Sequence, residues 1–359
     1  MNRLGPALAI SVLVLACQRA ISSGPTAAGA GAPLQQSPPA AGGAPLVYVS
    51  NEESTEISVI DSATDTLMGN IFVGKRPRGI KISPDGNTLY VALSGSPMAP
   101  PGTDESKLPP PDRSADGIAV VDMAARRLVR TLSTGEDPES FDFTADGSTL
   151  YVSNEDAATV TVVSLPSGRI ISTVAVGGEP EGVRLRPDGK VVYVTSEADN
   201  EVAVIDTMSN RLIAKIPTGA RPRGIVFTRD GTRAYISAEQ GGSVTLVDAA
   251  KHVALIDIPI GAKGAKPMGM AISPSGETVY VSCGRGGVVA LIDVASNRVT
   301  KIIEGVGMRP WGIGLTADGK KLYTANGPSN DVSVIDVATG TVVKKIPAGK
   351  GPWGVAITR

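Results

Sequence analysis

The stretch RPRGIKISPDGNTLYVAL, residues 76–93, decides the fold. It contains two short runs of mainly apolar residues, and between them lies the turn signal Asp85-Gly86. β-branched and aromatic residues favour strands, and glycine supplies the positive φ that a tight hairpin turn requires. The stretch therefore predicts two antiparallel strands joined by a tight turn.

The same pattern recurs along the chain at a nearly constant spacing. Its proline returns seven times, followed two positions later by glycine in six copies, and all seven tyrosines share the rhythm. Successive prolines lie 42 to 45 residues apart, except for a first interval of 61 residues. The repeat prolines are Pro77, Pro138, Pro180, Pro222, Pro267, Pro310 and Pro352. Each unit holds four strand-like runs, and this number of strands at this period is typical of a β-propeller.

The first and last units are incomplete in a complementary way. The repeats begin at the second run of one unit, Val47 to Val49, and stop after the first run of another, which ends at Thr358. The two fragments together make one four-stranded sheet. We therefore expect an all-β, seven-bladed β-propeller over residues 46–359, with four-stranded blades and a split terminal blade that closes the ring.

Several of these repeats resemble a known family. The segments YVSNE, YVTSE and SNDVSVIDVATG, together with RPRGIKISPDG, are similar to the YVTN family of propeller repeats, which are WD40-like. Within that family they are similar to exported propellers associated with PQQ-dependent catabolism. The resemblance implies a seven-bladed fold and a role linked to periplasmic quinoprotein or redox metabolism. It does not identify a reaction.

The N-terminus has the pattern of an export signal. Residues 1–17 contain one positive charge, an apolar stretch too short to cross a bilayer, and a final Cys17. Val14-Leu15-Ala16-Cys17 resembles a lipobox, which implies acylation of Cys17 and an outer-membrane-anchored lipoprotein of the periplasm; the alternative is an ordinary signal peptide. Residues 18–45 are rich in Ala, Gly, Pro, Ser and Gln, so we expect a disordered tether.

Composition excludes several classes of function. Lys and Arg total 34 and Asp and Glu total 35, so the net charge of −1 gives no global attraction for nucleic acid. One histidine and two cysteines are too few for c-type haem, zinc ribbons or multi-histidine copper sites. We expect a monomer that carries no resident cofactor, with calcium or another divalent cation as the one exception.

One face of the ring, which we call the top face, gathers the candidate site residues. The residues beside each repeat proline lie where the innermost strand begins, next to the mouth of the central channel. Two adjacent units are acidic there, and the others are basic or aromatic. The expected ligand-binding set is Arg76, Arg78, Glu139, Glu181, Arg223, Arg309, Trp311 and Trp353.

Acidic residues on this face have two interpretations. Some should form inter-blade ion pairs: Glu52 with Arg76 and Arg78, Glu197 with Arg221 and Arg223, and Glu239 with Lys266. Glu155 has no evident basic neighbour, so its cluster is either screened by solvent or joined by a cation such as calcium through hard oxygen ligands. The candidate metal ligands are Asp137, Glu139, Glu155, Glu179 and Glu181.

Four other features remain open. The two tryptophans either plug the channel or form a stacking platform beside Arg78 and Arg309. The proline-rich insertion at 95–115 is either a lid over the channel or a protein-docking loop. Cys283 is expected to be an unpaired packing residue, and His252 a solvated residue on the opposite face.

Three functions follow. Since no nucleophile and base are paired in the sequence, the first hypothesis is a non-enzymatic scaffold that binds a small ligand or a periplasmic redox protein. The alternative is a metal-dependent hydrolase or lactonase that uses the acidic top-face residues. A further alternative is a subunit of a redox enzyme complex.

Overall fold

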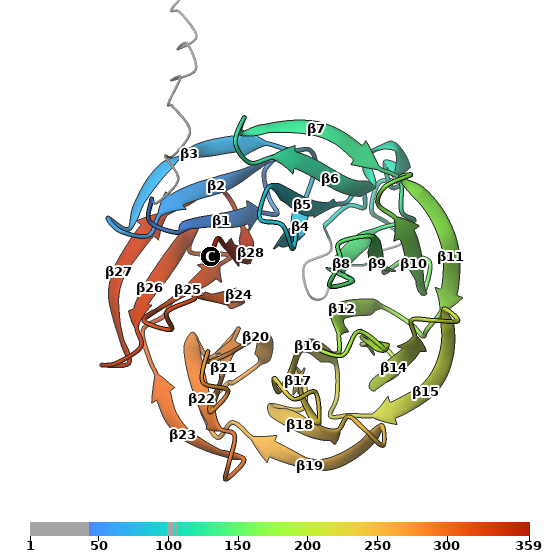
Figure 1. The fold of residues 1–359 in the computed structure, drawn as a ribbon. Helices are drawn as coiled ribbons and strands as arrows, with labels where there is room; N and C mark the ends of the chain where they lie inside the picture. Colours follow the sequence, from blue (N-terminus) through green and yellow to red (C-terminus); the bar gives the residue numbers. More distant parts are fainter. Residues whose placement is uncertain (1–42, 99–103, 105–106) are drawn as a thin grey trace, which may run out of the picture. The chain divides into compact units, whose positions relative to one another are not determined.

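The structure is a computed structural model, and it describes residues 43–98, 104 and 107–359. Seven four-stranded antiparallel sheets stand around a central axis, and we number these blades 1 to 7 (Figure 1). This confirms the predicted seven-bladed, all-β propeller. The signal peptide, Cys17 and most of the predicted tether lie outside the described residues.

Each blade has four strands that follow one another outward from the central axis. Blade 1 is, in this order, β28 (Pro352–Ile357), β1 (Leu46–Asn51), β2 (Glu56–Asp61) and β3 (Thr66–Phe72). Blade 2 is β4 (Pro77–Ile82), β5 (Thr88–Leu93), β6 (Gly117–Asp122) and β7 (Arg127–Leu132). Blade 3 is β8 (Pro138–Phe143), β9 (Thr149–Asn154), β10 (Thr159–Ser164) and β11 (Arg169–Ala175).

The remaining blades repeat this order. Blade 4 is β12 (Pro180–Leu185), β13 (Val191–Ser196), β14 (Glu201–Asp206) and β15 (Arg211–Pro217). Blade 5 is β16 (Pro222–Phe227), β17 (Arg233–Ala238), β18 (Ser243–Asp248) and β19 (Val253–Pro259). Blade 6 is β20 (Pro267–Ile272), β21 (Thr278–Cys283), β22 (Val288–Asp293) and β23 (Arg298–Ile303). Blade 7 is β24 (Pro310–Leu315), β25 (Lys321–Asn326), β26 (Asp331–Asp336) and β27 (Thr341–Pro347).

Ring closure follows the predicted split. β1 pairs antiparallel with β28, so the two ends of the repeat region share blade 1 (Figure 1). The Leu46 backbone N–H donates to the Thr358 hydroxyl at 2.8 Å, and the Thr358 N–H donates to the Leu46 carbonyl at 3.0 Å. The last strand is therefore the innermost strand of a sheet whose other three strands come from the start of the repeats.

The core lies within and between the blades. Apolar side chains of the two middle strands are buried, as are all seven repeat tyrosines, whereas most residues of the outermost strands are exposed. The inner strands pack so closely that a Cβ at Gly182 would lie 2.0 Å from the Arg223 carbonyl oxygen of the next blade. This contact explains why glycine follows the repeat proline two positions later.

Tyrosine hydroxyls tie neighbouring blades together on the face opposite the site. Tyr151 donates to Asn210 at 2.8 Å and Tyr235 donates to Asn297 at 2.7 Å. The Tyr193 hydroxyl lies 2.7 Å from Nδ1 of His252 in the equivalent slot. The expectation of a merely solvated His252 is therefore wrong, because this half-buried ring belongs to the set of inter-blade contacts.

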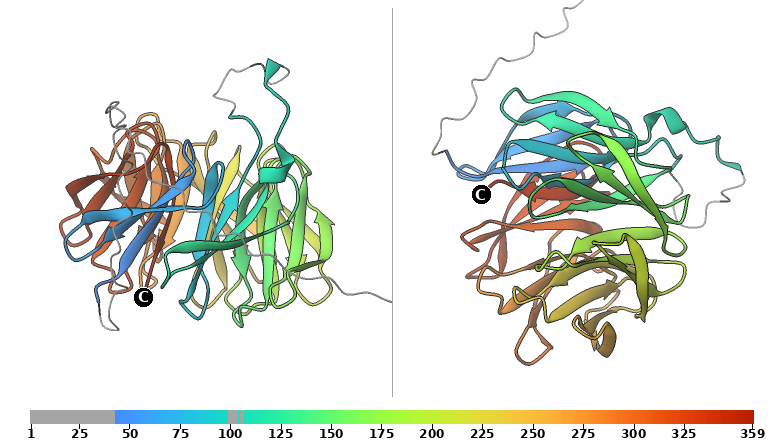
Figure 2. Two further views of the ribbon diagram at one scale, coloured as in Figure 1. Left: turned by 90° about the horizontal axis from the view of Figure 1, so that it is seen from above. Right: turned by 45° about the vertical axis from the view of Figure 1, so that its right-hand side comes forward.

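The insertion in blade 2 rises from the rim of the ring (Figure 2). Its described residues contain a short 3-10 helix, Arg113–Ala115. Arg113 contacts Asp116 at 3.2 Å and Asp156 of blade 3 at 2.7 Å, so the base of the insertion is fixed to the neighbouring blade. Within the described ranges, no helix is both long and apolar enough to cross a membrane.

Candidate active site

The backbone before each inner strand places the candidate residues. Five residues that precede a repeat proline hold a positive φ between 42° and 57°: Arg76, Asp137, Glu179, Arg221 and Arg309. A left-handed backbone costs a non-glycine residue about 1–2 kcal/mol. Since glycine takes this slot at position 351, we infer that these five blades keep a strained backbone for the sake of their side chains.

Hydroxyl groups of the second strands hold the inner strands in register. The Ser50 hydroxyl donates to the Arg78 carbonyl at 2.6 Å, and Ser153 donates to the Glu181 carbonyl at 2.7 Å. Thr195 donates in the same way across the next blade boundary. Each bond fixes the backbone of a residue whose side chain belongs to one of the two ion-pair clusters described next.

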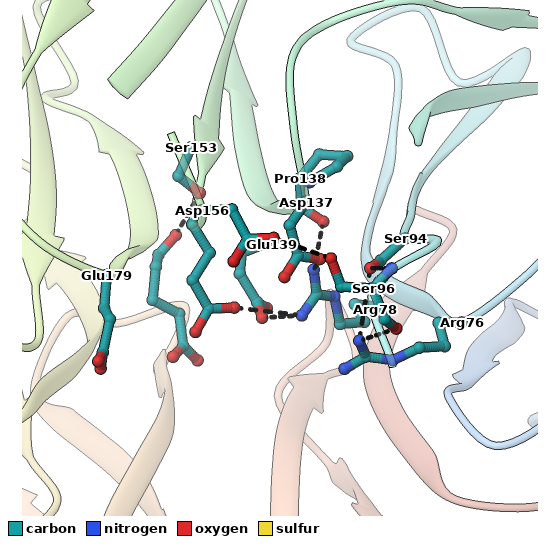
Figure 3. Close-up of polar contacts among 12 residues, drawn as sticks. Arg76, Arg78, Ser94, Ser96, Asp137, Pro138, Glu139, Ser153, Asp156 and Glu179 are labelled. Carbon is teal, nitrogen blue, oxygen red and sulfur yellow. Dashed lines mark hydrogen bonds and ion pairs between the residues drawn. The ribbon is translucent and has the colours of Figure 1, made fainter. Parts of the chain in front are cut away.

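Arg78 is the centre of a buried ion-pair cluster. Its side chain is only 2% exposed and reaches from blade 2 into blade 3, where Nη2 contacts Asp137 and Nη1 contacts Glu139 (Figure 3). Nη1 also lies 3.4 Å from Glu155 Oε2, and Nη2 donates to the Pro138 carbonyl at 3.0 Å. The prediction that Glu155 has no basic neighbour is wrong. The long Arg78 side chain extends from blade 2 into blade 3, whereas basic neighbours were expected only from the following blade.

A second cluster surrounds Arg223 of blade 5. Its guanidinium contacts Glu181, lies 2.6 Å from Glu197, and lies 2.9 Å from Glu239. Arg221 also approaches Glu197, at 2.7 Å. The predicted pairing of Glu197 with both arginines is confirmed.

The other two predicted pairings need correction. Glu239 pairs with Arg223 of its own blade and not with Lys266, because the Arg223 guanidinium lies 2.9 Å from the Glu239 carboxylate. Glu52 pairs with Arg76 at 2.6 Å, whereas Arg78 turns the other way into blade 3.

Carboxylates outnumber the arginines that face them, and the pKa values reflect this. Burial raises the pKa of Glu139 well above its ordinary value, and the nearby Glu155 carboxylate raises it further. Burial also raises the pKa of Glu155, against the opposing effect of Arg78. In the second cluster, burial and the Glu181 carboxylate raise the pKa of Glu197 to about 12. The pKa of Glu181 stays below its usual range despite burial, because Arg223 lies beside it. In each cluster, burial and the neighbouring carboxylate therefore favour the protonated form of one carboxyl group.

An aromatic and cationic sector surrounds Trp311 and Trp353, whose strands β24 and β28 lie across the ring from β8 and β12 of the acidic blades (Figure 1). The rings of Trp311 and Trp353 stack with centroids 6.0 Å apart and planes 27° apart. The Arg309 guanidinium lies 4.3 Å from the Trp311 ring centroid, and that of Arg223 lies 5.5 Å from it. The platform therefore includes Arg309 as expected, but Arg78 belongs to the acidic cluster instead.

These sectors line one cavity of about 1040 Å³ on the top face. The structure brings all of the expected ligand-binding residues to this region, although Glu181 lies behind Arg223 and does not line the cavity. The insertion contributes Pro97, Met98 and the segment 108–111 to its wall. The described part of the insertion thus borders the cavity.

Sequence reasoning missed several residues of this wall. Asp156, Arg285 and Ser96 line the cavity as well. Their only signal was position, because each lies in a loop at the same end of its blade as a predicted site residue. Nothing in the local sequence distinguishes them from ordinary turn residues.

The proposed metal ligands are occupied by arginine contacts. Asp137, Glu139 and Glu155 all face Arg78. Within the part of the chain that the structure describes, no three His, Cys, Asp or Glu side chains are arranged to hold a metal ion. The donor set therefore does not fit a divalent cation in this arrangement.

Cys283 lies apart from this chemistry. The thiol is free and fully buried in blade 6, and burial raises its pKa to about 12. A thiol with this pKa is a poor nucleophile at neutral pH. Its role is packing, as expected.

The fold and the site define a seven-bladed propeller with a charged cavity at one end of its axis. Residues 43–184 and 206–353 match the family described as "Lactonase, 7-bladed beta-propeller", and the chain belongs to this family. The membership overturns the hypothesis of a non-enzymatic scaffold and favours the alternative of a lactonase-type enzyme.

Individual relatives are distant. The chain is 27% identical over 138 residues to Antigen Lp49 of Leptospira interrogans, a match that covers 30% of each protein. A putative 6-phosphogluconolactonase from Bacteroides fragilis superposes with a TM-score of 0.71 at 18% identity, over 89% of this chain and 100% of that one. Kuenenia stuttgartiensis Hydrazine Synthase gives a TM-score of 0.66 at 22% identity, over 78% and 89% respectively. At these identities the structural likeness shows the fold alone.

Proposed function

We propose that the chain is a lactonase that hydrolyses a lactone in the top-face cavity, with Glu155 as the general base. The observation that carries this proposal is the position of Glu155. Its side chain is 29% exposed, lines the cavity, and has a raised pKa beside Arg78. A carboxyl group tuned toward neutral pH by burial and still open to substrate is suited to proton transfer.

The reaction needs one water molecule and one mobile proton. Glu155 accepts a proton from the water as its oxygen bonds to the lactone carbonyl carbon, which gives a tetrahedral oxyanion. When the acyl C–O bond of the ring breaks, the Glu155 carboxyl returns the proton to the leaving alkoxide oxygen. The product is a hydroxy acid, and the enzyme ends in its starting protonation state.

Fixed positive charge supports this step. Arg78 is held by Asp137 and Glu139, so its guanidinium needs no reorganisation when negative charge develops nearby. Arg76 lies at the same wall, where it donates to the Ser96 carbonyl at 2.6 Å and pairs with Glu52. The Glu155 backbone N–H donates to the Asp137 carbonyl at 2.9 Å, which anchors the base to the inner strand.

A divalent cation takes no part in this mechanism. The carboxylates that were candidates for metal binding contact Arg78, and a guanidinium supplies positive charge at the same place. Substrate binding and acid–base catalysis therefore fall to Glu155 and the two arginines beside it.

The test is a substitution that keeps shape and removes basicity. We expect Glu155→Gln in the full chain to lower kcat for lactone hydrolysis by about 10²–10⁴-fold, the usual contribution of a positioned general base. The matched control is Glu136→Gln, since Glu136 is 60% exposed, precedes the same blade and does not line the cavity. Equal rates for wild type and Glu155→Gln would contradict the proposal.

We further propose a narrower family and a location. The YVSNE and SNDVSVIDVATG segments support membership of the YVTN group, and the lipobox-like Val14 to Cys17 supports a lipid anchor at the outer membrane, facing the periplasm. On this proposal the enzyme works as a monomer, and the link to PQQ-dependent catabolism would lie in the source of its lactone.

A further inference from the structure

The cavity wall carries charged residues on every blade, but apolar side chains on one side only. Its apolar side chains come from three consecutive blades: Trp311 and Pro328 from blade 7, Trp353 from blade 1, and Met98 and Leu108 with neighbouring prolines from blade 2. Blades 3 to 6 contribute charged residues and one glutamine. Such a division suits a ligand that is itself apolar on one side and polar on the other.

The apolar part leads directly to the proposed catalytic group. Trp311, Trp353 and Arg78 occupy the same slot of three inner strands, β24, β28 and β4, which are neighbours around the ring. The backbones of the last two strands are joined through Ser50, whose hydroxyl accepts from the Gly354 N–H at 2.9 Å and donates to the Arg78 carbonyl. Arg78 in turn contacts Glu155, and the aromatic rings and the base line the same cavity.

Among the described residues, one group at this platform lacks a hydrogen-bond partner and another lacks an ion-pair partner. The Trp311 indole N–H is buried without a hydrogen-bond partner among the described residues. Arg309 lies over the Trp311 ring, and no described carboxylate forms an ion pair with it. A donor and a cation beside stacked rings favour a flat group with an acceptor close to it.

We propose that the site takes a lactone that carries an aryl substituent, whose ring lies against Trp311 and Trp353 while the ester faces Glu155. This inference rests on the proposed lactonase function and names its substrate class. It distinguishes the site from one built for a fully polar sugar lactone, because a hydroxylated ring would leave the apolar part of the wall without a partner.

The experiment compares two lactones with similar leaving groups. γ-Phenyl-γ-butyrolactone and γ-valerolactone both release a secondary alkoxide and differ in phenyl against methyl. We expect Trp353→Ala to lower kcat/KM for the phenyl lactone about tenfold more than for γ-valerolactone, because only the phenyl ring loses its stacking partner. Trp353→Phe keeps a flat ring and should therefore retain most of the kcat/KM for the phenyl lactone. It also replaces the alanine variant in the comparison if that variant fails to fold.

A binding measurement gives a readout besides activity. The chain has only two tryptophans, and both line the cavity, so its tryptophan fluorescence reports on this site. Titration with 4-hydroxy-4-phenylbutanoate, the product of the phenyl lactone, should change the emission saturably, and Trp353→Ala should raise the Kd about tenfold.

The outcomes separate the two proposals. Selective loss on the phenyl lactone supports the inference. Equal effects on both lactones, or no effect on either, overturn the aryl substrate class and leave the lactonase function standing. If wild type hydrolyses neither lactone, and no other lactone either, the proposed function fails and the inference fails with it.

Discussion

Replacement of Arg78 by methionine tests whether the acidic cluster depends on one buried cation. The substitution keeps most of the side-chain volume and removes the guanidinium from Asp137, Glu139 and Glu155. Since Arg78 is 2% exposed, its carboxylate partners gain little solvent in exchange. Removal of one partner from a buried ion pair costs about 3–5 kcal/mol.

The expected change in melting temperature follows from chain length. Residues 43–359 number 317, and unfolding entropy of about 2.1 cal/mol/K per residue gives roughly 0.7 kcal/mol/K. A loss of 3–5 kcal/mol therefore lowers Tm by about 4–8 °C. The exposed pair Lys75–Asp112 supplies the control, because its side chains are 57% and 44% exposed and Lys75→Met should cost less than about 1 kcal/mol.

The pH dependence of this loss identifies its cause. Without Arg78 the pKa values of the three carboxyl groups rise, from a lowered value for Asp137 and from raised values for Glu139 and Glu155, so the folded variant binds more protons than the unfolded chain above the ordinary carboxyl range. Its stability then falls as pH rises, and the deficit against wild type shrinks as pH is lowered toward 4.5. Calorimetry at several pH values measures this. A Tm within about 1 °C of wild type at pH 7, or a deficit independent of pH, would refute the reasoning.

Three further predictions concern closure, anchoring and the buried thiol. Deletion from Gly351 onward should abolish cooperative unfolding, because it removes β28, exposes the inner edge of β1 and leaves β24 and β4 without the strand between them; a truncated chain that melts near the intact protein would rule this out. Cys17→Ser should move the protein from the membrane fraction to soluble extracts, and equal solubility of both forms would remove the lipid anchor. Cys283 should resist alkylation at pH 8 in the native protein and react at once in denaturant, since burial raises its pKa to about 12; rapid native labelling would contradict its packing role.

The fold could be predicted because the repeat is visible at every level. Seven prolines and seven tyrosines keep one period, and the complementary end fragments determine how the ring closes. The alternation of strands then determines which loops share a face, so the top-face residues were placed correctly as a group. Each of these inferences depends on backbone periodicity alone.

The contacts within the site could not be predicted in the same way. Arg78 and Arg223 occupy equivalent slots in two RPR segments, yet Arg78 reaches forward into blade 3 and Arg223 reaches back to Glu181 of blade 4. The direction depends on which neighbouring blade offers unpaired carboxylates, and that is a property of three-dimensional packing. The same reason explains why Glu239 selects Arg223 over Lys266.

The pH dependence of kcat/KM for lactone hydrolysis tests the central claim most directly, because it reports the pKa of the essential base in the free enzyme. With Glu155 as that base, the rate should rise with pH through a single midpoint above 4.5, the ordinary glutamate value. The midpoint should be absent from the residual activity of Glu155→Gln. A rate that is flat between pH 4 and pH 8, or a midpoint that survives in Glu155→Gln, would contradict the assignment of Glu155 as the catalytic base.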